Sequence, residues 1–336
     1  MRVIACLMII CMHAPMPAPN AIPLLLNATG YFMAPGLCLF FVLSGALLLP
    51  TTLSARAFLR KRLAKILWPT LSFTAIYLAL KYFSGEQVDW LAAIASIPFS
   101  PQGHGVLWFM YTLIGLYLLT PIISPWLAKA SRRELEFYLL LWAITLCYPL
   151  LQLIINIDTT VTGPLYYFTG YAGYFLLGHY LNKYPDALPL KHLALPTAIA
   201  VIAPIACKLT HINLDFYSIF WYLSIFVAIL TVAIFRALNR CDFAAIGEGK
   251  LQRFITLTSN LSFGIYLCHI AIMRQLVWRL PCIQAIPNYL LQFLAIVAVT
   301  ATLSFLTAYI LSRLPIAPYL IGYQQTPTQH HKDYPL

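Results

Sequence analysis

The residues most able to do chemistry in this sequence are Arg2 and His13, which lie eleven positions apart on one apolar run. Eleven helical steps of about 100° return to within roughly 20° of the starting direction, so both side chains would share one stripe, about 16 Å apart along the axis. An imidazole can move protons near neutral pH, and a guanidinium can hold an anion. In a lipid-embedded helix such a pair normally faces a protein-lined cavity. The simpler alternative makes Arg2 a cytoplasmic flank and His13 an interfacial residue.

The composition explains why a lipid-embedded helix is the relevant case. Hydrophobic residues form 61% of the 336 positions and charged residues only 9%, whereas soluble domains carry about 25% charged residues. We therefore expect an integral membrane protein. The formal charge of +11 does not indicate nucleic-acid binding, because the basic residues punctuate apolar segments instead of forming one patch. The eight cysteines lack metal-ligand spacing, so no metal site is predicted.

The pattern of apolar segments predicts an all-α bundle of about ten transmembrane helices, because each span needs about 20 mostly apolar residues. The first segment is too short to cross a full bilayer, and Pro196 and Pro204 are expected to interrupt the seventh. The predicted segments are 2–14, 31–50, 63–83, 105–125, 135–155, 165–182, 193–211, 216–236, 257–278 and 288–313.

The distribution of basic residues favours an even number of spans with both termini in the cytoplasm. On this map 17 of the 21 basic residues fall on the inner side, and the exceptions are Lys81, Lys208, Arg274 and Arg279. Positive residues gather on the cytoplasmic side of membrane proteins. Residues 1–323 are therefore predicted to form one membrane domain, and 324–336 a polar cytoplasmic tail.

The basic triplet Arg60, Lys61 and Arg62 comes directly before the third predicted helix. An ordinary cytoplasmic anchor would have this composition. The functional alternative is a phosphate clamp, because guanidinium groups match phosphate oxygens and a cofactor entering from the cytoplasm would meet them first.

Two further segments carry candidate cavity residues. Ser262, Tyr266 and His269 recur at i, i+4 and i+7, so they share one face of a predicted helix. Together with Arg274 they form a cavity wall, or they are interhelical hydrogen-bonding groups. Trp108 opens the fourth predicted helix, either beside a cavity or in the interfacial aromatic belt. No role is assigned to the nearby His104. The Ser44-Gly45 pair is explained by close helix packing.

These motifs, in this order, resemble the acyltransferase-3 family of bacterial membrane O-acyltransferases. The resemblance rests on the Arg-x10-His spacing, the Phe-Phe-Val-Leu-Ser-Gly run, the Arg-x-Arg of the basic triplet, the Leu-Trp-Phe opening of the fourth helix, and Ser-Phe-Gly-Ile-Tyr-Leu-Cys-His. It covers the whole ten-helix body. The sequence departs from the family in having only Met1 before the motif arginine, a longer spacing between His104 and Trp108, and no fused esterase-like domain.

The resemblance implies transfer of an acyl group from cytoplasmic acyl-CoA, usually acetyl-CoA, to a hydroxyl of a surface polysaccharide or lipid-linked sugar in the bacterial inner membrane. His13 matches the essential histidine of the family and Arg2 its paired basic residue. Arg60 and Arg62 match a motif thought to serve the CoA, with Lys61 between them. The chemistry agrees, since an imidazole with a pKa near 6.5 can take the proton of a sugar hydroxyl as it attacks a thioester.

The main alternative is a polytopic transporter or a flippase of a lipid-linked glycan, which would also use intramembrane His and Arg. Coupled transport usually needs a buried acid. By our map the ten acidic residues lie in loops, termini or the edge of one helix, which disfavours that alternative.

Overall fold

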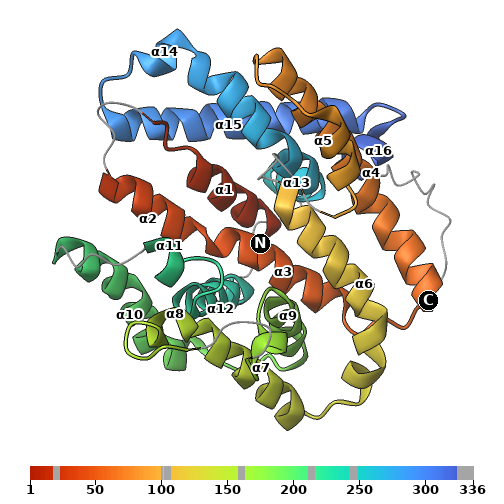
Figure 1. The fold of residues 1–336 in the computed structure, drawn as a ribbon, viewed down its shortest axis with the longest axis vertical. Helices are drawn as coiled ribbons and strands as arrows, with labels where there is room; N and C mark the ends of the chain where they lie inside the picture. Colours follow the sequence, from red (N-terminus) through yellow and green to blue (C-terminus); the bar gives the residue numbers. More distant parts are fainter. Residues whose placement is uncertain are drawn as a thin grey trace.

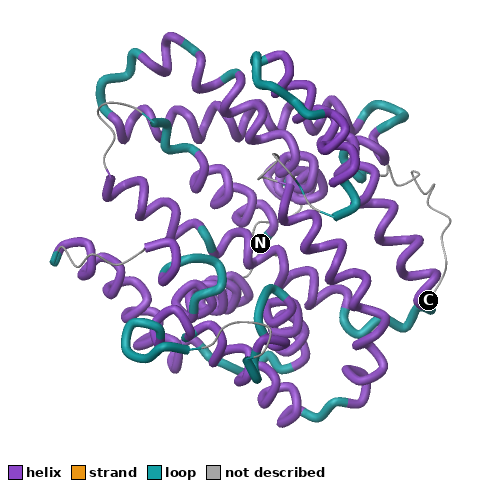
Figure 2. Tube along the Cα trace, viewed as in Figure 1, coloured by secondary structure: helices purple, strands orange, loops and turns teal. Residues whose placement is uncertain are grey.

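The computed structural model describes residues 1–17, 23–99, 101, 107–157, 163–210, 216–241 and 249–323, with the backbone alone at 23–27, 216 and 218. All regular secondary structure in this part is helical, with no strand (Figure 2). The predicted tail 324–336 and His104 lie outside the described residues.

The helices follow the apolar segments closely and are labelled in Figure 1. In chain order they are α1 (Arg2–His13), α2 (Pro23–Met33), α3 (Pro35–Leu48), α4 (Ala55–Phe83), α5 (Trp90–Ser96), α6 (Trp108–Lys129), α7 (Arg132–Leu146), α8 (Tyr148–Leu151), η2 (Tyr166–Phe168), α9 (Ala172–Lys183), α10 (Leu190–Leu209), α11 (Phe216–Ile219), α12 (Ile225–Arg240), α13 (Lys250–Gln275), η4 (Val277–Arg279), α14 (Pro281–Gln284), α15 (Tyr289–Ser312) and α16 (Ala317–Leu320).

Six helical segments in the described part are long and apolar enough to cross a membrane, against the ten spans predicted. They are Ala28–Leu48, Ala55–Phe83, Trp108–Lys129, Leu190–Leu209, Lys250–Arg279 and Tyr289–Ser312. The other four predicted segments are the helices α1, α7, α9 and α12, of 12, 15, 12 and 16 residues. At 1.5 Å per residue these helices are about 18–24 Å long, shorter than the roughly 30 Å hydrocarbon core. The count of ten and the orientation of the termini therefore stay predictions.

The expectation that prolines interrupt the seventh segment is wrong. Helix α10 runs without a break over 20 residues, with Pro196 and Pro204 inside it. A proline removes one backbone hydrogen bond from a helix, and in membrane helices the freed groups find other partners.

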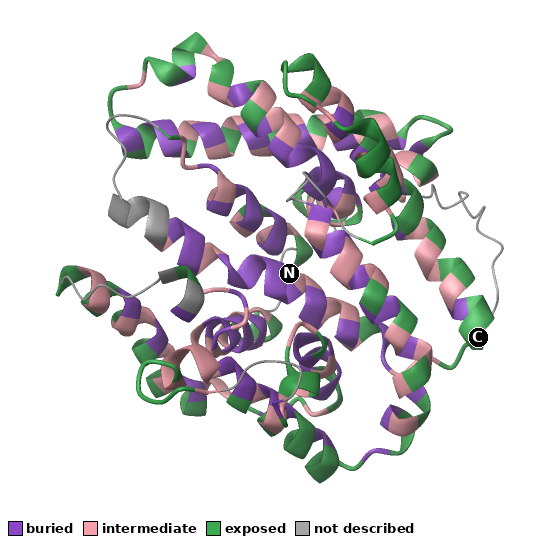
Figure 3. Cartoon of the chain, viewed as in Figure 1, coloured by how far each residue is buried: buried purple, intermediate pink, exposed green. Residues whose placement is uncertain are grey.

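Helix α1 lies at the centre of the bundle, between α15 and α3 (Figure 1), and packs on α2, α3, α13 and α15. Buried residues concentrate along α1, α3, α9 and α13 (Figure 3). The α3–α9 crossing is close because it is built on glycines. A Cβ atom on Gly45 would overlap the Phe175 carbonyl group, and one on Gly178 would overlap that of Val42. Packing therefore accounts for Gly45, as the small-residue pattern indicates.

Basic residues at several helix ends are brought together on one side of the bundle. Arg132 at the start of α7 donates to Asp186 beyond α9 at 2.7 Å, and the Lys183 ammonium donates to the Ala130 carbonyl at 3.3 Å. Arg236, buried at the end of α12, donates to the carbonyls of Leu181, Tyr184 and Ala187. These contacts place the ends of α6, α9 and α12 side by side, in agreement with the pattern of basic loops.

Candidate active site

His13 and His269 form a pair of imidazoles between the end of α1 and the C-terminal third of α13. Their ring centroids are 5.6 Å apart, with the planes inclined at 41°. Helix α1 packs on α13, and the Cys6 thiol donates to the Ser262 carbonyl at 3.3 Å. This packing aligns the two helices, so that the last residue of α1 meets the third polar residue of the α13 stripe.

The stripe of α13 is buried along its whole length. Ser262, Tyr266 and His269 are 5%, 7% and 1% exposed. The His269 Nδ1 lies 2.5 Å from the Tyr266 carbonyl oxygen, and the two rings are 5.6 Å apart. Since a carbonyl only accepts, this Nδ1 carries a proton. The His269 Nε2 is buried and has no hydrogen-bond partner among the described residues.

An aromatic wall continues from the histidine pair towards α6 and the segment before α12. The Phe109 ring lies 5.3 Å from Tyr266, and the Trp108 ring lies 5.1 Å from Tyr171 and 5.4 Å from Tyr222. The Tyr222 hydroxyl donates to the Met12 sulfur at 3.3 Å, one residue before His13. Trp108 therefore packs in this wall, beside the end of α1.

At the opposite end of α1, Arg2 and Arg62 of α4 both lie within electrostatic range of Tyr117, which is buried on α6. Arg2 is exposed, whereas the Nε atom of Arg62 is buried and has no hydrogen-bond partner in the described part of the chain. Two guanidinium groups thus lie near Tyr117, at the end of α1 away from the histidine pair.

The basic triplet does not act as one clamp, because it is divided between two faces of α4. Arg60 and Lys61 are exposed and line a hollow of about 590 Å³, together with Lys65, Trp68 and residues of α16 that include Tyr319. Successive helical residues diverge by about 100°, which turns Arg62 away from this hollow and towards the bundle.

Several residues of this site carry no motif that sequence reasoning could use. Tyr171 and Tyr222 come from short irregular segments, and only packing brings their rings to Trp108. Arg274, one turn beyond His269, acts electrostatically on both imidazoles and lies 5.7 Å from the Trp278 ring. Unlike the two tyrosines, Arg274 is named from the sequence, as a continuation of the polar stripe.

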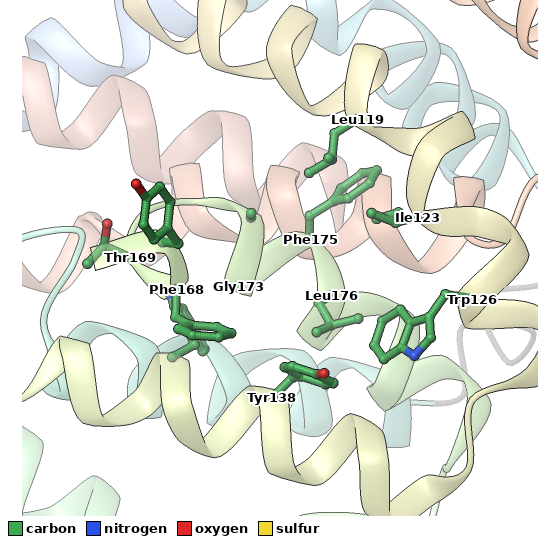
Figure 4. A pocket seen from close by; sticks show the side chains of 12 residues that line it. Leu119, Ile123, Trp126, Tyr138, Phe168, Thr169, Gly173, Phe175 and Leu176 are labelled. Carbon is green, nitrogen blue, oxygen red and sulfur yellow. The ribbon is translucent and has the colours of Figure 1, made fainter. Parts of the chain in front are cut away.

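Of two other cavities, one lies away from the predicted site residues and the other lies beside part of α1. A pocket of about 340 Å³ between α6, α7, η2 and α9 is lined by aromatic and aliphatic side chains, among them Trp126, Tyr138 and Phe168 (Figure 4). An apolar groove of about 410 Å³ between α1, α13 and α15 is lined by Cys6 and Ile10. A cavity that faces both Arg2 and His13 stays a prediction. Among the described residues no cluster of His, Cys, Asp or Glu could hold a metal ion.

The fold and the site together define a helical membrane protein with a histidine pair between two of its helices. The chain belongs to the acyltransferase-3 family, since the family model Acyl_transf_3, described as an acyltransferase domain, matches residues 1–309. The family resemblance in the sequence is thereby confirmed, and the protein is a membrane acyltransferase. No curated protein and no solved structure matches the chain.

Proposed function

We propose that this protein transfers an acyl group, with acetyl as the default, from cytoplasmic acyl-CoA to a hydroxyl of a cell-surface or lipid-linked polysaccharide in the bacterial inner membrane. The observation that carries the proposal is the arrangement along α1. A histidine pair stands at one end of this helix and two guanidinium groups at the other, within a chain of the acyltransferase-3 family.

His13 is the general base of the proposed reaction. A sugar hydroxyl is a poor nucleophile at neutral pH, and removal of its proton during attack is typically worth about 10²–10⁴ in rate. As the hydroxyl oxygen bonds to the thioester carbon, its proton passes to His13. The C–S bond then breaks, and the proton passes from His13 to the departing CoA sulfur. The acyl ester and free CoA are the products.

The cations of α1 and α4 serve the donor. In this proposal Arg2 and Arg62 hold phosphate groups of CoA at the base of α1, and Arg60 and Lys61 supply further cations in the hollow that they line. None of these four residues has an ion-pair partner among the described residues. Unpaired guanidinium groups are suited to bidentate contacts with phosphate oxygens. Arg2 and His13 are about 16 Å apart along α1, so an extended thioester arm can reach the imidazole while the phosphates stay at the base.

The test is transfer of label from [14C]acetyl-CoA in membranes of the native organism that carry the protein and its acceptor. We expect acid-stable, alkali-labile label in the polysaccharide fraction, which identifies an O-ester. His13→Ala should abolish incorporation while the amount of protein in the membrane stays unchanged. Absence of label with the wild-type protein, together with movement of a lipid-linked glycan across the membrane, would instead support the flippase alternative.

A further inference from the structure

His269 stands beside His13 with one ring nitrogen engaged and the other without a partner in the described part of the chain. Its Nδ1–H donates to the Tyr266 carbonyl of its own helix, which fixes the ring and leaves Nε2 as an acceptor. Nε2 is the atom at the tip of the ring and is buried, with the residue only 1% exposed. The neighbouring ring is that of His13. A buried acceptor of this kind is costly unless it receives a hydrogen bond.

No carboxylate of the described part is available to orient His13. Proton-transfer histidines usually have a carboxylate or carbonyl that fixes their tautomer. The five acidic residues that the structure describes are all engaged elsewhere: Glu86 with Lys81, Asp89 and Glu134 at helix N-caps, and Glu136 and Asp186 with Arg132. The ring of His269 occupies the place beside His13 where such a group would stand.

The two rings are neighbours in the structure but are not hydrogen-bonded to each other. We propose that His269 is a positioning residue: once the substrates are bound, the His13 ring turns to donate a hydrogen bond to His269 Nε2, and this bond fixes the tautomer with which His13 acts as a base. This inference rests on the proposed function. In that bond one ring nitrogen of His13 keeps its proton and donates to Nε2. The other ring nitrogen then carries the lone pair, which takes the hydroxyl proton of the acceptor and later gives it to the CoA sulfur. His269 itself neither gains nor loses a proton.

Two substitutions test the role of His269 Nε2 separately from that of Nδ1. His269→Asn keeps an amide N–H where Nδ1 bonds the Tyr266 carbonyl but removes the acceptor at Nε2. His269→Gln places an amide oxygen close to the position of Nε2. We expect His269→Asn to lower the rate of acetyl transfer at saturating acetyl-CoA by about 10², the lower end of the range for general-base help. The KM for acetyl-CoA should change less than twofold. The rate of His269→Gln should be at least tenfold higher than the rate of His269→Asn.

His179 supplies a matched control on α9. It is also buried, its Nδ1 lies 3.0 Å from the Leu49 carbonyl, and its Nε2 has no partner among the described residues. His179→Asn therefore removes the same atoms from a similar environment, and we expect no change in the maximal rate. If His269→Asn keeps the wild-type rate, or if the three variants lose activity equally, the positioning role is wrong.

A second measurement is independent of the acyl acceptor. Diethyl pyrocarbonate modifies the lone-pair nitrogen of an imidazole, and mass spectrometry of the peptide that contains His13 gives the rate of modification. We expect this rate to fall at least fivefold in His269→Asn and to stay unchanged in His179→Asn. An unchanged rate in both variants overturns the positioning role. Failure of label transfer by the wild-type protein would overturn the proposed function alone, because the reactivity of His13 is read separately.

Discussion

Gly178→Ala should loosen the tightest helix crossing of this protein. The added Cβ atom would overlap the Val42 carbonyl oxygen and lie 2.7 Å from the carbonyl carbon, whereas ordinary contacts at a Cβ atom begin at 3.4 Å. The carbon alone requires helices α3 and α9 to separate by about 0.7 Å, and the closer oxygen requires more. A gap of about 0.5–1 Å already forfeits a quarter to a half of each dispersion contact. Because the obstacle is backbone, no side-chain rotation can relieve it. We expect a loss of about 1–3 kcal/mol of stability, the usual cost of overpacking.

Gly115→Ala in α6 is the matched control. It makes the same substitution in a helix, and no atom lies within 4 Å of the added Cβ. Replacing glycine by alanine in a helix stabilises it by about 0.8–1 kcal/mol in the absence of steric conflict. The two variants should therefore move thermal stability in opposite directions.

Thermal unfolding of the purified protein in detergent, followed by the loss of monodisperse material in size-exclusion chromatography, measures the effect. The midpoint should fall by several degrees in Gly178→Ala and stay equal or rise in Gly115→Ala. Equal midpoints in the two variants would refute the reasoning, since they would show that the α3–α9 crossing tolerates a methyl group.

Three further predictions concern the charged residues. Arg62→Gln should raise the KM for acetyl-CoA about tenfold, the effect of losing about 1.4 kcal/mol of binding, with the maximal rate little changed in steady-state assays; an unchanged KM removes Arg62 from the donor site. Arg236→Met removes the guanidinium that donates to three carbonyls. The Tyr184 carbonyl still accepts from the Ala187 amide, so the loss falls on the Leu181 and Ala187 carbonyls, at about 1–3 kcal/mol for each buried group left unsatisfied. A thermal midpoint equal to that of the wild type would contradict this expectation. Hydrogen bonding to Arg132 lowers the pKa of Asp186 below its ordinary value of 3.8. The stabilising effect of ionised Asp186 is therefore present above pH 3.8 and is lost as the pH falls through the lowered pKa. Asp186→Asn should lower the thermal midpoint slightly at pH 7, because the pair is exposed. If the variant lowers the midpoint equally below pH 3, where the carboxylate becomes protonated, ionisation of Asp186 is not the cause.

The elements of the fold could be predicted from the sequence because they depend on local composition. Each of the ten predicted segments overlaps a helix, and the first, predicted at 2–14, forms the single helix Arg2–His13. The lengths of the helices were harder to predict. The ends of a helix such as α9 depend on its polar residues and its packing, and not on the thickness of a bilayer alone. Pro196 and Pro204 show the same limit, because their effect depends on the neighbours of the helix.

The candidate site could be predicted one helix at a time but not as an assembly. The polar stripe of α13 followed from its spacing, and all three residues are buried. The meeting of His13 with His269 joins positions 256 residues apart, and no local pattern encodes such a contact. The separation of Arg62 from Arg60 follows from helical geometry alone, yet which face meets the bundle depends on how α4 packs on α6 and α16.

The shortness of α1 fixes the depth at which the chemistry would occur. A helix of 12 residues that starts at one membrane surface ends about 18 Å away, a little beyond the midplane of a 30 Å hydrocarbon layer. His13 would then be reached from both leaflets over comparable distances. Under the proposed function, a nucleotide in one aqueous compartment and a glycan in the other would then both reach His13, and only the small acyl unit would change sides.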